Sequence, residues 1–200
     1  MPERSRLGVD ERRSRLLALG VELFSERSYD ELSVDDIARA AGVSKGLLYH
    51  YFDGKRGFYV ESVRQAAGLL RDRVEAAIDV ETDPLMQLRV GIRAYLGYVG
   101  DHARAYVALL RGGIGYDPEV AAIVDETREF FLNRLLRDFE QPPDPPLRNA
   151  LRGFVGFVEA ASLDWAERRD VGQNELGALL LKMAEHTIVA LGEAQAEKLV

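Results

Sequence analysis

The sequence predicts an all-α protein, because apolar residues recur at helical spacing along most of the chain. No segment shows the alternation of apolar and polar residues that a half-buried strand requires. Turn-forming residues separate the periodic segments, most clearly in the run QPPDPP at 141–146. Two hundred residues are enough for a substantial core. We therefore expect about nine helices in two domains, 1–54 and 55–200.

The first helix is expected over about 11–27, with Leu16, Leu17, Leu23 and Phe24 on one side and Gly20 allowing close approach. The preceding residues, including Arg4 and Arg6, are expected to form an unstructured tail or an arm that enters the DNA minor groove.

Two short helices should follow. Ser33 is a favourable N-cap, and Asp36 stands three residues later at a capping-box position. Gly42 stands where a helix needs a left-handed residue at its end. Ser44 can then cap a second helix that ends near Phe52, with Leu48 and Phe52 on its core side. Two short helices joined by a tight glycine turn are typical of helix-turn-helix, whose second helix enters the major groove of DNA.

The remaining helices follow from apolar stripes and from Asp-Pro or Gly-Gly boundaries. We expect them at about 55–78, 84–99, 104–111, 118–135, 147–168 and 175–195.

The segment ARAAGVSKGLLYHYFDGK, preceded by RLLALGVELFSERSYDELSVDDI, resembles the DNA-binding domain of TetR-family transcriptional regulators. The resemblance covers about residues 11–60 and rests on the Ala-Ala-Gly-Val turn and the Leu-Tyr-x-Tyr-Phe-x-x-Lys ending. The remaining residues match this family only in length and helical character. The resemblance implies a dimeric regulator, by default a repressor, that binds double-stranded DNA.

The resemblance also implies DNA contacts at Lys45, Gly46, Leu47, Tyr49, His50 and Tyr51, and Ser44 begins the same helix. Lys45 lies in the first turn, from which side chains reach base edges, and could donate to guanine. Ser33 and Lys55 each begin a helix and could meet a phosphate there.

The charge distribution opposes strong non-specific DNA binding. The net charge is −7, yet residues 1–56 carry ten basic and ten acidic residues, so the excess acid lies in 57–200. Residues 37–52 contain Arg39 and Lys45 and no acid. We therefore expect a locally cationic face and a dependence on directed contacts.

The composition argues against several other classes. The chain has no cysteine, its three histidines lie far apart, and no apolar run reaches the length of a membrane helix. No nucleophile motif or phosphate-binding glycine loop is present. We expect a soluble cytoplasmic protein without a metal, a cofactor or enzymatic activity.

The last two helices are apolar on more than one face, which suits a four-helix interface between two copies of the chain. The residues expected at this homodimer interface are Leu151, Val155, Val158, Leu176, Leu180, Met183, Thr187 and Leu191.

Aromatic residues between 85 and 168 could wall a pocket for a small apolar or aromatic effector. They are Tyr95, Tyr98, Tyr106, Phe130, Phe131, Phe154, Phe157 and Trp165. The effector would move the helix at 55–78 and release a palindromic operator. Two alternatives remain open: a helical enzyme or carrier, and a DNA-binding protein that responds to a protein partner.

Overall fold

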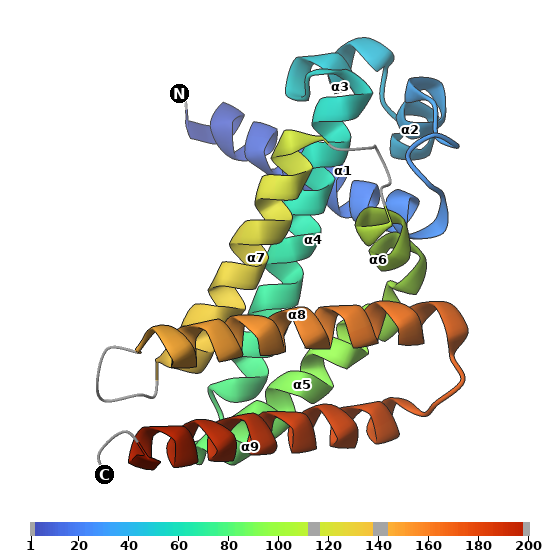
Figure 1. Cartoon of the computed structure of the whole chain (residues 1–200). Coiled ribbons are helices and arrows are strands. Elements are labelled where there is room, and N and C mark those ends of the chain that lie inside the picture. Colours follow the sequence, from blue (N-terminus) through green and yellow to red (C-terminus); the bar gives the residue numbers. More distant parts are fainter. Residues whose placement is uncertain (1–2, 112–116, 138–143, 198–200) are drawn as a thin grey trace. The chain divides into compact units, whose positions relative to one another are not determined.

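The computed structural model describes residues 3–111, 117–137 and 144–197, and this part of the chain contains nine α-helices and no strand (Figure 1). The predicted all-α fold is confirmed. The helices are α1 (Glu3–Glu26), α2 (Val34–Ala41), α3 (Lys45–Tyr51), α4 (Gly54–Ile78), α5 (Pro84–Asp101), α6 (Ala103–Leu110), α7 (Pro118–Leu136), α8 (Pro145–Arg168) and α9 (Gln173–Glu197).

Helix α1 begins earlier than expected. It starts at Glu3, so the backbone at Arg4 and Arg6 is helical and does not form the expected tail. The residues before the apolar stripe include Glu, Arg and Leu, which favour a helix and allow α1 to extend toward the N-terminus.

The helices form two compact units. The N-terminal unit contains Met1–Leu69 and His102–Ile123, and the C-terminal unit contains Leu70–Asp101 and Val124–Val200. The division between the units falls within two helices, after Leu69 in α4 and after Ile123 in α7. Packing thus groups the residues of α4 up to Leu69 with α1–α3, and the functional boundary between residues 54 and 55 stays a prediction.

The N-terminal unit is built around aromatic side chains. Phe58 of α4 is fully buried, and its ring lies 5.9 Å from Phe24 of α1 and 5.0 Å from Phe52 after α3. Leu48 of α3 is also fully buried, which confirms the predicted core role of Leu48 and Phe52. A Cβ at Gly20 would collide with Phe58 and Ser62, so glycine is what lets α4 approach α1.

In the C-terminal unit, α5, α8 and α9 pack against one another (Figure 1). Leu132 of α7 is fully buried beside Leu147, Leu151 and Val155 of α8. A second cluster joins the last turns of α4 to α5 through Leu70, Val74, Ile78 and Tyr98. None of the described helices has both the length and the apolar character needed to cross a bilayer.

Candidate nucleic-acid interface

The start of α2 carries a complete capping box. The hydroxyl oxygen of Ser33 accepts the Asp36 N–H at 3.1 Å, and the Asp36 carboxylate accepts the Ser33 N–H at 3.1 Å. The Ser33 hydroxyl also donates to that carboxylate at 2.6 Å. These bonds from the Ser33 side chain and backbone lower the pKa of Asp36. The reciprocal bonds fix where the chain enters α2.

The turn between α2 and α3 follows the predicted chemistry. Gly42 adopts the left-handed conformation with φ of 64°, and its N–H donates to Arg39 O at 3.2 Å. The Val43 N–H donates to Ala38 O at 3.0 Å, which closes the end of α2. Ser44 then caps α3, its hydroxyl accepting the Leu47 N–H at 3.2 Å. These bonds orient α3 relative to α2.

Helix α3 has a buried side and an exposed side. Leu48 and Phe52 anchor it in the core, whereas Tyr49 is 57% exposed. Among the predicted contact residues, Ser33, Ser44, Lys45, Gly46, Tyr49 and His50 are exposed, and Leu47, Tyr51 and Lys55 are half-buried. The structure therefore gathers the exposed members of α3 on one surface, while DNA contact at each of these residues stays a prediction.

The cations of this surface already have partners within the chain. The Lys45 ammonium lies 2.6 Å from a carboxylate oxygen of Asp35, and Arg39 lies 3.2 Å from Asp36. The Lys55 ammonium lies 4.1 Å from the centroid of the Tyr29 ring, a cation–π geometry. The expected cationic face of residues 37–52 is thus offset by two acids that stand just before that window. Packing of α2 against α3 brings Asp35 to Lys45, whereas Asp36 meets Arg39 one turn later on α2 itself.

The sequence did not predict a group of ion pairs, here called the Arg56–Asp117 clasp, that joins the start of α4 to the start of α7. Arg56, in the first turn of α4, donates to both carboxylate oxygens of Asp117 at 2.6 and 3.0 Å and to Glu119 at 2.8 Å. The Asp117 side chain is only 8% exposed, and its bonds with Arg56 lower its pKa. Asp117 was recognisable as the cap of the next helix, but its partner stands 61 residues away.

The predicted pocket aromatics differ in burial and in the residues around them. Tyr95, Tyr98 and Phe131 pack in one core cluster, with the Tyr95 and Phe131 ring centroids 5.7 Å apart. Burial raises the pKa of Tyr98 to about 12. Phe154 and Trp165 are buried, and the Trp165 indole N–H donates to Val171 O at 2.9 Å. Phe157 is exposed on α8, and Tyr106 belongs to the N-terminal unit.

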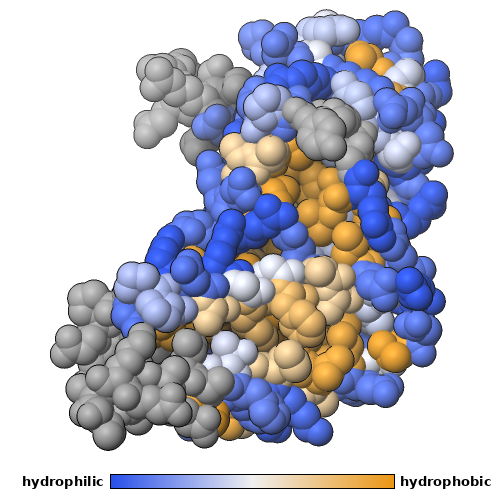
Figure 2. Space-filling view, in the orientation of Figure 1, coloured by the Kyte–Doolittle hydropathy of each residue, from blue (hydrophilic) through white to orange (hydrophobic). Residues whose placement is uncertain are grey.

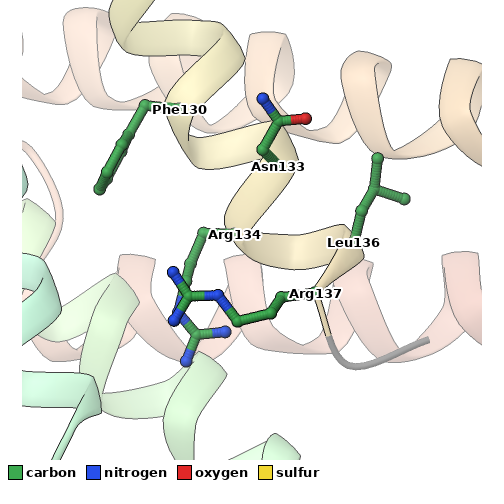
Figure 3. Close-up of a pocket in the computed structure, with 5 residues that line it drawn as sticks. All are labelled: Phe130, Asn133, Arg134, Leu136 and Arg137. Carbon is green, nitrogen blue, oxygen red and sulfur yellow. The ribbon is translucent and has the colours of Figure 1, made fainter. Parts of the chain in front are cut away.

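A hollow of about 330 Å³ lies along the last turns of α7 (Figure 3). It is lined by Phe130, Asn133, Arg134, Leu136 and Arg137. Of the aromatic residues predicted to line a pocket, Phe130 is the one among these five. Arg134 is nearly buried and donates to Gln87 at 2.8 Å. Arg134 and Arg137 both approach Glu75, at 3.5 and 3.8 Å, so the two guanidinium groups converge beside the hollow.

Half of the eight residues predicted for the dimer interface are buried within the single chain. They are Leu151, Val155, Leu176 and Leu180, and their place at an interface stays a prediction. Val158 and Thr187 are half-buried, Met183 is exposed, and the side chain of Leu191 lies outside the described residues. The exposed apolar residues are instead Phe157 on α8 and Leu179, Met183 and Val189 on α9. Figure 2 shows apolar side chains gathered where α8 and α9 run side by side.

Comparison with known proteins identifies the family. Residues 16–61 match the family described as bacterial regulatory proteins, tetR family. Residues 84–187, slightly more than half of the chain, match the tetracyclin repressor-like C-terminal domain. The chain belongs to the TetR family. It is therefore a DNA-binding transcriptional regulator and not an enzyme.

Individual relatives agree with this assignment. A tetR-family transcriptional regulator from Streptomyces coelicolor superposes with a TM-score of 0.80 at 30% identity, covering 94% of this chain and 86% of that one. The repressor KstR2 from Rhodococcus jostii is 28% identical over 168 residues, which is 82% of this chain and 72% of KstR2. The activator FasR from Mycolicibacterium smegmatis is 32% identical over 125 residues, but the match spans only 57% of FasR and 62% of this chain.

A more distant neighbour shows the shared fold alone. FadR from Bacillus subtilis, solved in complex with stearoyl-CoA, has a TM-score of 0.68 at 18% identity. The match covers 85% of this chain and 96% of FadR.

Among the described residues no group of three or more His, Cys, Asp or Glu side chains could hold a metal ion.

Proposed function

We propose that this TetR-family protein binds a palindromic operator as a homodimer and that a small-molecule effector releases it. The observation that carries the proposal is the exposed face of α3. Lys45, Tyr49 and His50 project to solvent while Leu48 holds the helix in the core. A rigid helix with polar side chains on its free face suits the major groove. Lys45 is the residue best placed to read guanine, and Tyr49 and His50 can donate to base edges or phosphates.

A dimer follows from the size of the reading element. Helix α3 spans Lys45–Tyr51 and can contact only a few base pairs, which is too little to select one site in a genome. Two copies placed about 34–36 Å apart would read successive major grooves of a two-fold symmetric site. We again propose α8 and α9 as the dimer interface, and we place its contacts on the apolar residues that are exposed in the single chain.

These residues are Phe157, Leu179, Met183 and Val189, of which Leu179 is 51% and Val189 59% exposed. The glycines Gly153 and Gly156 are exposed on α8, and a Cβ at either would meet nothing within 4 Å. Small residues beside large apolar ones let helices of two copies approach closely. Leu176 and Leu180 contribute from beneath this face by holding α9 in place.

The hollow at the end of α7 is our candidate effector site. Its volume of about 330 Å³ lies at the lower end of the usual range for small-molecule pockets. Phe130 and Leu136 offer apolar surface, and Arg134 and Arg137 offer planar cations that bind carboxylates or phosphates bidentately. We therefore propose an effector with an apolar or aromatic body and an acidic group. FadR, crystallised with stearoyl-CoA, offers a precedent for an apolar chain joined to an anionic carrier on this fold.

Repression is the proposed direction of control. The relative named as a repressor, KstR2, aligns over more of this chain than the relative named as an activator, FasR.

Helix α4 could couple the hollow to α3. It runs without interruption from Gly54 to Ile78, so its first turn follows α3 and its last turns carry Glu75 beside the hollow. A ligand that favours one position of α4 would change the spacing of the two recognition helices.

The experiment that tests this function is a selection of bound duplexes from random DNA, followed by footprinting of the enriched sequence. We expect a two-fold symmetric site whose half-sites lie about one helical turn apart. Enrichment of no sequence by a folded dimer would contradict the proposal. Effector control is tested on the selected site with decanoate and, as a neutral control, decanol. Release by decanoate that weakens in Arg137→Gln would support the α7 hollow, and equal release in that variant would exclude it.

A further inference from the structure

We propose that Asp35 determines DNA selectivity through its ion pair with Lys45, at the start of the recognition helix. Lys45 would leave this pair readily to contact operator DNA but only poorly to contact random DNA. The inference rests on the proposed role of Lys45 in DNA binding. It assigns a function to an acidic residue that stands within the DNA-binding unit and would itself repel phosphate.

The geometry sets Asp35 apart from its neighbour Asp36. Asp36 forms the capping box with Ser33 and pairs with Arg39, so it has a structural task. Asp35 makes no cap bond, and its carboxylate instead reaches the next helix to meet Lys45 at 2.6 Å. Both side chains of this pair are 55% exposed. The pair is therefore accessible to DNA and can be opened without unfolding either helix.

The pair changes what Lys45 gains from each kind of DNA. A lysine with no partner gains a phosphate contact on any duplex and releases a counterion as it does so. Lys45 must exchange one anionic oxygen for another, and the exchange leaves Asp35 close to the phosphates. Random DNA offers little beyond that exchange. An operator guanine offers two directed acceptors, O6 and N7, which favour the open state.

The surrounding charges point the same way. Residues 1–56 have no net charge, and Arg39 and Lys55 are also engaged by partners within the chain. The segment that carries α3 therefore has no excess of positive charge, and these cations must leave contacts within the chain before they can bind phosphate. Such a surface binds weakly to DNA in general and depends on base contacts for affinity.

The test compares Asp35→Asn with Asp53→Asn. Both variants remove one negative charge from the N-terminal unit, and Asp53 is an exposed residue just after α3. We expect Asp35→Asn to bind random duplex roughly three- to tenfold more tightly than wild type, with a log–log salt slope steeper by about 0.9. Its affinity for the selected operator should rise less, so that the ratio of the two affinities falls. Asp53→Asn should change both affinities equally and slightly.

Repeating the Asp35→Asn change in a Lys45→Ala protein completes a double-mutant cycle for this pair. If Asp35 acts through Lys45, adding Asp35→Asn to Lys45→Ala should leave random-DNA affinity unchanged apart from the effect seen with Asp53→Asn. Asp35→Ser, which also suits a helix start, serves as a second variant if Asp35→Asn unfolds.

Equal gains in Asp35→Asn and Asp53→Asn, or an equal rise on operator and random DNA, would overturn the inference and leave only general electrostatics. A different failure concerns the proposed function itself. If Lys45→Ala binds the operator as tightly as wild type, then α3 does not read DNA through Lys45.

Discussion

The two compact units leave chemically different surfaces to solvent. In the N-terminal unit, the exposed face of α3 is polar, its Lys45 is paired with Asp35, and Lys55 at the start of α4 lies over the Tyr29 ring. In the C-terminal unit, α8 and α9 leave large apolar side chains exposed, among them Leu179 and Met183. The first surface suits a partner that comes and goes by exchanging charged contacts. The second suits a partner that stays, because apolar area is best covered permanently.

The largest expected effect separates two neighbours on α9. Leu180 is fully buried and Leu179 is 51% exposed. Leu180→Ala should lower the free energy of unfolding by about 2–5 kcal/mol, because it leaves a cavity in the core. Leu179→Ala should change the unfolding free energy of the monomeric chain by about 0.5 kcal/mol or less. Urea unfolding at low and high protein concentration measures both, and equal losses in the two variants would remove the distinction between core and interface.

A second prediction tests the apolar face of α9 directly. Leu179→Glu combined with Met183→Glu should place charges between the two copies and give a monomer in analytical ultracentrifugation. Operator affinity should fall by at least about tenfold, because each half-site would be bound alone. Asn174→Glu, at an exposed polar position on the same helix, is the matched control and should stay dimeric. A dimer that survives the double change must form elsewhere.

The capping box gives a smaller effect in the N-terminal unit. Ser33→Ala removes the acceptor of the Asp36 N–H and should destabilise the chain by about 1 kcal/mol. Thermal unfolding measures the loss. Ser33→Asp should restore most of it, because Asp is also a good N-cap. A Ser33→Ala variant with unchanged stability would mean that the bonds at this helix start contribute nothing net.

The smallest effect concerns pH. Arg56 lowers the pKa of Asp117, so this carboxylate stabilises the fold above its ordinary pKa and loses that contribution as the pH falls through the lowered value. Arg56→Gln should therefore be less stable than wild type near neutral pH, and the difference should shrink in acid. Chemical denaturation across pH checks this. A difference that grows on acidification would have the wrong sign for the proposed pairing.

The helix-turn-helix could be predicted because its signals are local. Ser33 with Asp36, Gly42 and Ser44 each act within a few residues, and the structure shows the bonds that these residue types predict. The ion pair of Lys45 with Asp35 escaped prediction, because it depends on how α2 packs against α3. The Arg56–Asp117 clasp joins residues 61 positions apart, which no local pattern reveals.

In the C-terminal unit the helices could be predicted, but not which of their apolar side chains are buried and which are exposed. Leu176 and Leu180 recur at helical spacing, and that spacing is the same whether a stripe faces its own chain or a second copy. Aromatic residues have the same ambiguity, since Tyr98 and Trp165 became core while Phe157 became surface. The two arginines of the α7 hollow gave no signal, because a charged residue on a helix usually faces solvent.

The most direct test of the account is the affinity of the selected operator for wild type and for Lys45→Ala/Tyr49→Ala, measured by fluorescence anisotropy beside a random duplex of equal length. We predict that the double variant stays folded and dimeric, loses at least about tenfold in operator affinity and no longer prefers the operator. Operator affinity and preference equal to those of wild type would contradict DNA reading by α3.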